Sequence, residues 1–110
     1  MNLKGQGSED PVSAHQRTCV TREEFADLIV VRVIGDLDMA TAAELHSALS
    51  PDSGRPIVVD LAETTFMDSS GLNVLVGAHL SGSVVVLRHP SPVVRRAIDV
   101  SGLDQILTIE

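Results

Sequence analysis

The chain has 110 residues, which is enough for one small domain with a single hydrophobic core. Its 8 basic and 15 acidic side chains give a formal net charge of -7, and this sign argues against binding to nucleic acid or to an anionic membrane, because both require a basic surface. The single cysteine, Cys19, excludes an internal disulfide and a cysteine metal cluster. With no long apolar run and no signal-like segment in the sequence, we expect a soluble cytoplasmic protein.

The N-terminal third begins without a clear pattern and then becomes apolar. Residues 1–16 mix glycine, serine, proline and charged side chains without periodicity, so they predict a flexible tail before a domain over residues 17–110. Residues 18–22 fit a short edge strand. Residues 28–34 form a nearly continuous apolar run, which is typical of a strand covered on both faces. Arg32 interrupts this run and indicates the edge of a sheet.

The middle of the chain alternates between helical and strand patterns. Apolar side chains at helical spacing predict a helix over about residues 40–49, ended by the turn at Ser50 and Pro51. Residues 57–61 and 84–87 fit buried strands. Between these strands, a helix of about three turns begins at Ser69 and ends near Gly82.

The C-terminal part adds one more helix and one more strand. Ser91 followed by Pro92 is a strong start signal, a capping hydroxyl before proline at the first helical position, and Gly102 suits the helix end. Residues 106–109 fit a last short strand. Because strands and helices alternate throughout, we expect a single α/β domain with a mixed, mainly parallel sheet.

The most informative segment is residues 66–72, where an apolar strand ends and an amphipathic helix begins. Ser69 falls at or near the N-cap of this helix, where its oxygen can accept from the free amides of the first turn. Unpaired amides and the positive end of the helix dipole suit a phosphate equally well. The segment therefore has two readings, a plain cap and a cap that doubles as a phosphorylation switch. On this segment alone, the plain cap is the simpler one.

Enzymatic and metal chemistry find little support in the residues. The glycine pattern of a serine-hydrolase nucleophile is absent around both Ser69 and Ser70, and His79 lies about 15 Å along the same helix from Ser69, too far to serve as its base. The only lysine, Lys4, is in the predicted tail, which removes serine–lysine catalysis and a Walker loop. The four histidines have no paired spacing, so we expect neither an enzyme nor a bound metal or cofactor.

Three blocks of sequence carry a resemblance to a known family. Residues 34–38 close a strand and open a helix, with Asp38 as a good helix cap, residues 58–72 contain a strand and the serine motif, and residues 92–103 contain the last helix. In this order the blocks resemble the STAS-domain anti-sigma factor antagonists of bacteria over about residues 20–110. The family fold usually ends with a C-terminal helix, and we expect this chain to lack it, because the sequence stops at Glu110.

The resemblance implies roles for the residues around the serine motif. Ser69, directly after the aspartate, corresponds to the serine that is phosphorylated in the family. An acidic residue at the position of Asp38 lies beside that serine and helps to shape the partner-binding surface. We therefore expect the partner-binding residues to be Asp38, Asp68, Ser69, Ser70, Gly71 and Asn73.

The resemblance also implies a function. The unphosphorylated protein would bind an anti-sigma factor and release the sigma factor for transcription, and the anti-sigma factor, an ATP-dependent serine kinase, would phosphorylate Ser69 and dissociate. A separate metal-dependent phosphoserine phosphatase would reset the switch, and the protein itself would need no cofactor. The alternative is a STAS subunit of a stress-signalling scaffold or a lipid-transport complex, in which Ser69 is a plain cap or a differently regulated site. The oligomeric state is left open.

Overall fold

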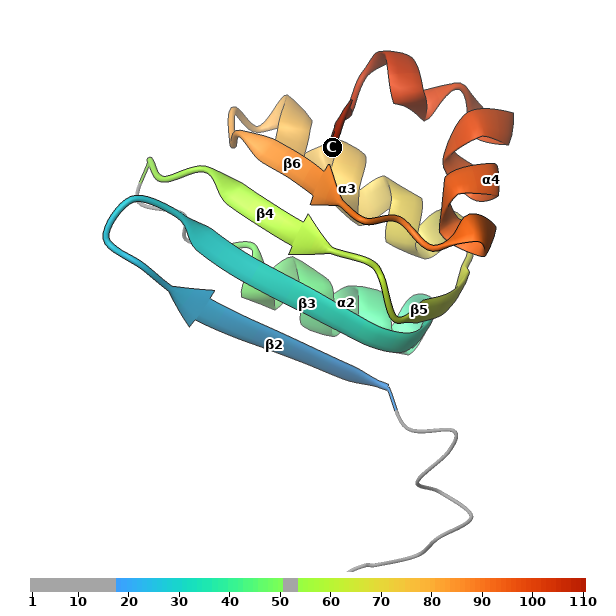
Figure 1. Cartoon of the computed structure of the whole chain (residues 1–110), viewed down its shortest axis with the longest axis horizontal. Coiled ribbons are helices and arrows are strands. Elements are labelled where there is room, and N and C mark those ends of the chain that lie inside the picture. Colours follow the sequence, from blue (N-terminus) through green and yellow to red (C-terminus); the bar gives the residue numbers. More distant parts are fainter. Residues whose placement is uncertain (1–17, 51–53) are drawn as a thin grey trace, which may run out of the picture.

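The computed structural model describes residues 18–50 and 54–110, so the predicted tail over residues 1–16 lies outside the described residues. One mixed sheet (Figure 1) contains the strands β2 (Cys19–Glu24), β3 (Ile29–Leu37), β4 (Ile57–Asp60), β5 (Thr64–Met67), β6 (Val85–Arg88) and β7 (Thr108–Ile109). The strands are connected by the helices α2 (Met39–Ala48), α3 (Ser69–Leu80) and α4 (Pro92–Ser101) and by a short 3-10 helix, η2 (Leu103–Gln105). Within the described ranges, no helix has the length and apolar character needed to cross a membrane.

The strand order is β2-β3-β4-β6-β7, with β5 paired to the later half of β3. β2 runs antiparallel to β3, whereas the other pairs are parallel, so the predicted α/β domain with a mixed, mainly parallel sheet is confirmed. The periodicity did not predict β5, because a strand of four residues in which only Thr64 and Met67 are buried shows no alternation. β7 is followed by Glu110.

The hydrophobic core lies on one face of the sheet. Alternate residues of β3 from Ile29 to Val33 are fully buried, whereas Val30, Arg32 and Ile34 are only partly buried. The core cluster joins the buried side of the strands to one face each of α2, α3 and α4. The parallel crossovers step in one direction along the sheet, and right-handed crossovers of this kind place their helices on the same face.

Two expectations for β3 were therefore wrong. The described helices cover only one of its faces, and Arg32 does not mark an edge, because β3 lies between β2 and β4. Arg32 instead pairs with Asp60 of β4, with 3.5 Å between Nε and Oδ2. The apolar run was misleading because the β-branched residues Val30 and Ile34 lie on the second face, and β-branched side chains suit a strand on either face.

Both predicted boundaries of α4 are confirmed, although one of them works differently from the prediction. Ser91 is the N-cap residue, but its hydroxyl donates to the Thr64 carbonyl (2.6 Å) and makes no capping bond to the helix. This hydrogen bond ties the start of α4 to β5. Gly102 ends the helix with a φ of 77°, a left-handed conformation that glycine adopts without strain.

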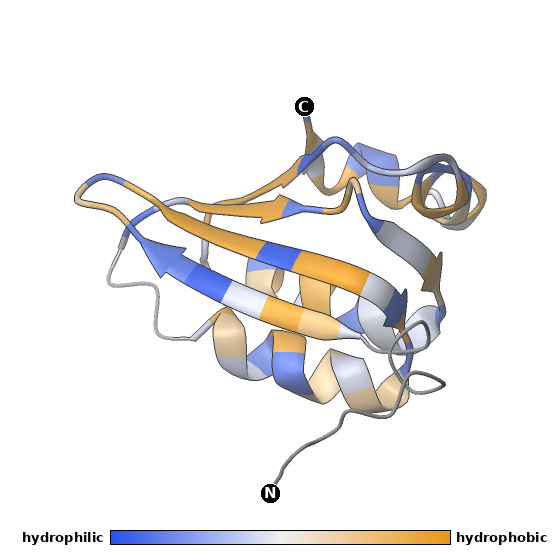
Figure 2. Cartoon of the chain, turned by 60° about the horizontal axis from the view of Figure 1, so that its bottom comes forward, coloured by the Kyte–Doolittle hydropathy of each residue, from blue (hydrophilic) through white to orange (hydrophobic). Residues whose placement is uncertain are grey.

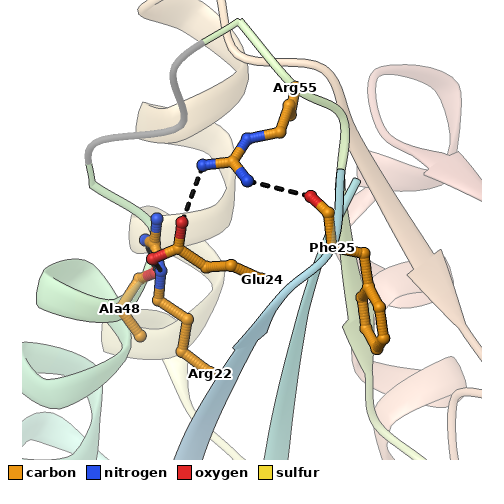
Figure 3. A network of polar contacts seen from close by, with 5 residues as sticks. All are labelled: Arg22, Glu24, Phe25, Ala48 and Arg55. Carbon is orange, nitrogen blue, oxygen red and sulfur yellow. Dashed lines mark hydrogen bonds and ion pairs between the residues drawn. The ribbon is translucent and has the colours of Figure 1, made fainter. Parts of the chain in front are cut away.

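A network of polar contacts holds the end of the sheet that lies opposite the start of α3 (Figure 3). Arg55, just before β4, donates to the Glu24 carboxylate (2.7 Å) and to the Phe25 carbonyl (2.9 Å). Arg22 donates to the Ala48 carbonyl at the end of α2 (2.6 Å). The hydrogen bond from Arg55 and the charge of Arg22 lower the pKa of the Glu24 carboxyl. The network therefore joins the β2–β3 hairpin to α2 and to the start of β4.

Candidate functional site

Two helices begin next to each other at the carboxyl ends of β3 and β5. These strands are parallel and in register at Leu37 and Met67, and each is followed directly by an aspartate, Asp38 or Asp68. The Asp68 amide also donates to the Leu37 carbonyl (3.3 Å). Because α2 and α3 pack against each other, the first turns of both helices, with their positive dipole ends, lie in one region of the surface.

Asp68, and not Ser69, is the N-cap of α3. Its backbone is extended, and its Oδ1 accepts from the amides of Ser70 (2.8 Å) and Gly71 (3.4 Å). Ser69 was predicted at or near the N-cap and lies one residue after it; aspartate and serine cap equally well, so the sequence could not rank the two adjacent candidates. Ser69 is the first residue of the helix, and its side chain is exposed. The Asp68 carboxylate thus occupies two of the amides that a phosphate at this helix start would use.

Asp38 caps α2 in the same manner, as its place in the sequence predicts. Its Oδ1 accepts from the Thr41 amide (3.1 Å) and from the Thr41 hydroxyl (3.2 Å). The bond from the Thr41 amide is the main cause that lowers the pKa of the Asp38 carboxyl, so this group is charged at neutral pH. Asp36, in β3 and two residues before Asp38, accepts from the Thr65 hydroxyl (2.8 Å). The surface around the two helix starts is therefore acidic.

Gly71 allows α3 to begin close to the strands. A Cβ at this position would lie 2.6 Å from Leu37 Cγ, 2.8 Å from Leu37 Cδ2 and 3.3 Å from Met67 Cγ. Contacts below 3.0 Å between carbon atoms are far inside the ordinary packing distance of about 3.5–4.0 Å. Since Gly71 is buried, its own atoms do not form part of the surface, and its contribution to the site is the position of the helix that carries Ser69.

The remaining residues of the expected partner-binding set lie on or near the same surface. Asn73 is exposed on α3 one turn after Ser69, on the same side of the helix, and Asp68 and Ser70 are partly buried. Sequence reasoning missed two apolar neighbours of the caps. Met39, the first residue of α2, is 76% exposed, and Phe66 in β5 is 45% exposed. Large apolar side chains in such places are typical contact residues of a protein interface, and the apolar residue directly after Asp38 was the available signal.

Outside the surface around the two helix starts, the described residues form no group that is suited to catalysis. A hollow of about 700 Å³ lies beside the later turns of α2 and α3, between side chains that include His46, Asn73, Val74 and Ala78. Among the described residues that line the hollow, His46 is the only titratable side chain, so they offer no pair of groups for acid–base catalysis. Among the residues that the structure describes, no three histidine, cysteine, aspartate or glutamate side chains are grouped to hold a metal ion.

Comparison with known proteins gives one consistent result. The chain matches the family model described as "Mlab, STAS domain" over residues 20–108. The anti-sigma-B factor antagonist of Listeria monocytogenes is 34% identical over 96 residues, which cover 81% of this chain and 84% of the relative. The crystal structure of an anti-sigma factor antagonist from Mycobacterium paratuberculosis is 27% identical, with a TM-score of 0.74 over 86% of each chain.

A second solved structure agrees. The anti-sigma factor antagonist SpoIIAA in its unphosphorylated form is 25% identical, with a TM-score of 0.66, and the match covers 84% of this chain and 88% of that chain. The family and the fold that the three sequence blocks predict are therefore confirmed. This chain belongs to the STAS domain family of anti-sigma factor antagonists.

Proposed function

We propose that this STAS domain protein is an anti-sigma factor antagonist whose binding to an anti-sigma factor is switched off by phosphorylation of Ser69. The position of Ser69 supports this switch most directly. Its side chain is exposed at the first position of α3 and makes no capping bond, because the neighbouring Asp68 caps the helix. A kinase can therefore reach this hydroxyl without unfolding the helix.

The unphosphorylated protein binds its anti-sigma factor through the surface around the two helix starts. The charged caps Asp38 and Asp68 and the exposed Asn73 supply polar contacts, and Met39 and Phe66 supply apolar ones. The surface is acidic and the whole chain has a net charge of -7, so the matching surface of the partner is basic. Binding releases the sigma factor for transcription.

The Asp68 carboxylate determines what a phosphate on Ser69 can do. The amides of Ser70 and Gly71 already donate to Asp68 Oδ1, at 2.8 and 3.4 Å, so the phosphate cannot use them without displacing another anion. A phosphate adds about -1.5 to -2 charges at pH 7, and a pair of like charges about 4 Å apart costs about 4 kcal/mol at an effective dielectric constant near 20. The phosphate group therefore points outward, towards the partner.

The interaction energies favour dissociation of the complex over a structural change at the start of α3. An exposed helix N-terminus returns only about 0.3–1 kcal/mol to a nearby anion, which is less than the repulsion between the phosphate and the aspartates. Since about 1.4 kcal/mol changes an affinity tenfold, a cost of a few kcal/mol at the interface weakens binding by two to three powers of ten. The helix keeps its Asp68 cap throughout.

The chemistry of the switch belongs to the partners. The anti-sigma factor is a serine kinase that uses ATP, and a metal-dependent phosphoserine phosphatase removes the phosphate. This protein is a cytoplasmic binding module that acts without a catalytic group, a cofactor, a membrane or direct contact with nucleic acid.

A phosphorylation assay on the full chain tests the site. With the cognate anti-sigma kinase and ATP, we expect one phosphate, located on Ser69 by fragment mass spectrometry. Ser69→Ala should abolish the modification and still bind the anti-sigma factor, and Ser69→Asp should bind at least about tenfold more weakly. The adjacent substitution Ser70→Ala is the matched control and should leave the phosphorylation rate near that of wild type. Phosphate on Ser70, or wild-type affinity of Ser69→Asp, would refute the assignment.

The alternative function, a STAS subunit of a stress-signalling scaffold or a lipid-transport complex, has a different partner. Co-purification separates the two functions, because a kinase-like anti-sigma factor supports the first and a membrane transporter subunit supports the second. In the second case Ser69 is a surface residue of α3 without a role in a phosphorylation switch.

A further inference from the structure

The face of the sheet that lies opposite the core carries side chains in two ordered rows. Residues paired across neighbouring strands point to the same face, and this pairing forms an apolar row of Val30, Val58 and Val86. The next row is charged and contains Arg32, Asp60, Arg88 and Glu110. We call these two rows together the open face.

No described element covers the open face. None of the three valines belongs to the core cluster; Val30 and Val86 are partly buried, and Val58 is 5% exposed. The Arg32 and Arg88 side chains are 42% and 36% exposed. Figure 1 shows β3, β4 and β6 with α2 and α3 behind them and no helix in front, and Figure 2 shows the predominantly hydrophobic colour of these strands. A row of apolar side chains on such a face is typical of a surface that packs against another protein.

The order of the charges along the charged row indicates which partner fits the open face. Arg32 on β3 pairs with Asp60 on β4 (3.5 Å), and Arg88 on β6 pairs with Glu110 after β7 (3.1 Å). Across the four strands the signs are therefore plus, minus, plus and minus. A surface with this order is complementary to its own copy in reverse order.

A two-fold axis that runs parallel to the strands, between β4 and β6, produces this reversal. Arg32 then faces Glu110 of the second copy, and Asp60 faces Arg88 of the second copy, so unlike charges meet along the whole row. In the neighbouring row, Val58 faces Val86 of the second copy, and Val30 faces Thr108 of the second copy, the β7 residue that pairs with Val86. A two-fold axis that crosses the strands along the charged row would instead place each charge opposite its own copy. We propose that the open face packs against the open face of a second copy of this chain, sheet on sheet, in a symmetric dimer.

The size of the open face makes this dimer weak. Four strands about 4.8 Å apart and four residues with a rise of about 3.3 Å span roughly 19 by 13 Å of sheet. This area is small beside the roughly 800 Å² of accessible surface that each partner buries in a standard interface, and the net charge of -7 on each chain adds repulsion. We expect a dissociation constant above about 1 μM, so monomers and dimers exchange as the concentration changes.

Sedimentation velocity of the full chain from about 10 μM to 1 mM tests the dimer. Val86→Lys places a charge in the apolar row, opposite Val58 of the second copy, and should weaken dimerisation at least about tenfold. Val100→Lys is the matched control, because Val100 is 78% exposed on α4 and lies outside the open face. It should dimerise like wild type. Far-UV circular dichroism and melting temperatures establish that both variants are folded.

A charge-swapped chain tests the geometry independently of stability. It carries Arg32→Glu, Asp60→Arg, Arg88→Glu and Glu110→Arg together, which keeps every ion pair of the row with its sign reversed. We expect this chain to dimerise with itself and not with fluorescently labelled wild type, because like charges would then meet along the row. A wild-type chain that stays monomeric over the whole concentration range, a Val86→Lys variant that dimerises like wild type, or mixed dimers that form as readily as pure ones would each overturn the proposal. If the charge-swapped chain does not fold, the Val86→Lys comparison decides alone.

Discussion

Two glycines of α3 should respond in opposite ways to the same substitution. Gly71→Ala adds a methyl group 2.6 Å from Leu37 Cγ and 2.8 Å from Leu37 Cδ2, and Leu37 is fully buried and has little space to move. Overpacking a core by a methyl group costs about 1–3 kcal/mol, and replacing glycine by alanine in a helix returns about 0.5–1 kcal/mol. The free energy of unfolding should therefore fall by about 1–2 kcal/mol.

Gly77→Ala is the matched control in the same helix. Nothing lies within 4 Å of a Cβ at Gly77, and the residue is exposed in the middle of α3. Here the propensity gain has no opposing clash, so the free energy of unfolding should rise by about 0.5–1 kcal/mol. For a domain of this size, each kcal/mol corresponds to about 4–8 °C in melting temperature, so the two variants should melt on opposite sides of wild type.

Urea denaturation followed by far-UV circular dichroism measures both free energies. Because the extra methyl group pushes the start of α3 away from β3, we also expect Gly71→Ala to be phosphorylated on Ser69 more slowly than Gly77→Ala. A Gly71→Ala variant as stable as wild type would refute the close packing of α3 on Leu37. A loss of stability in Gly77→Ala would refute the assignment of open space around that position.

Three further predictions concern the caps and the polar network. Asp68→Ala removes the cap of α3 and should lower the free energy of unfolding by about 1 kcal/mol. Ser69→Ala removes no cap, so its free energy of unfolding should stay within about 0.5 kcal/mol of wild type. Equal losses of the two variants in urea denaturation would contradict the cap assignment. The pKa of Asp38 is lowered in the folded protein, so the stabilisation by its charged form is present at neutral pH and is lost as the pH falls through the folded-state pKa, below the ordinary aspartate value of about 3.9. Asp38→Asn keeps the cap, so it should weaken the fall in the free energy of unfolding at acidic pH and change partner binding. If both the pH dependence of stability and the partner binding match wild type, Asp38 is a cap alone. Glu24→Gln removes the charge that pairs with Arg55 at the far end of the sheet, so it should also reduce the loss of stability at acidic pH. Ser69 of this variant should be phosphorylated at the wild-type rate. A slower rate would show that the two ends of the sheet are coupled.

The local pattern of the sequence was sufficient for most of the secondary structure. The helices over α2, α3 and α4 follow from apolar spacing and from end signals such as Ser91-Pro92 and Gly102, because both depend on residues within a few positions. The strands β3, β4 and β6 follow from their apolar runs for the same reason. β5 was missed, since a short strand with two exposed central residues is stabilised by its pairing with β3 and not by its own pattern.

The family and the serine motif were also readable in the sequence, because they consist of residue types in a fixed order. The tertiary structure decided how these residues work. Leu37 and Met67 are far apart in the chain, and only their parallel pairing brings the caps Asp38 and Asp68 together. The choice of Asp68 over Ser69 as the cap depends on backbone angles and on the reach of one carboxylate to two amides, which neighbouring good caps cannot reveal in advance.

The same distinction applies to the faces of the sheet. Sequence alone established that β3 is apolar, because valine and isoleucine suit a strand wherever it lies. Only the positions of the helices decided that one face is the core and that the other is open among the described residues. Burial depends on what packs against a side chain, and the helices that share the core with β3, namely α2, α3 and α4, lie elsewhere in the chain.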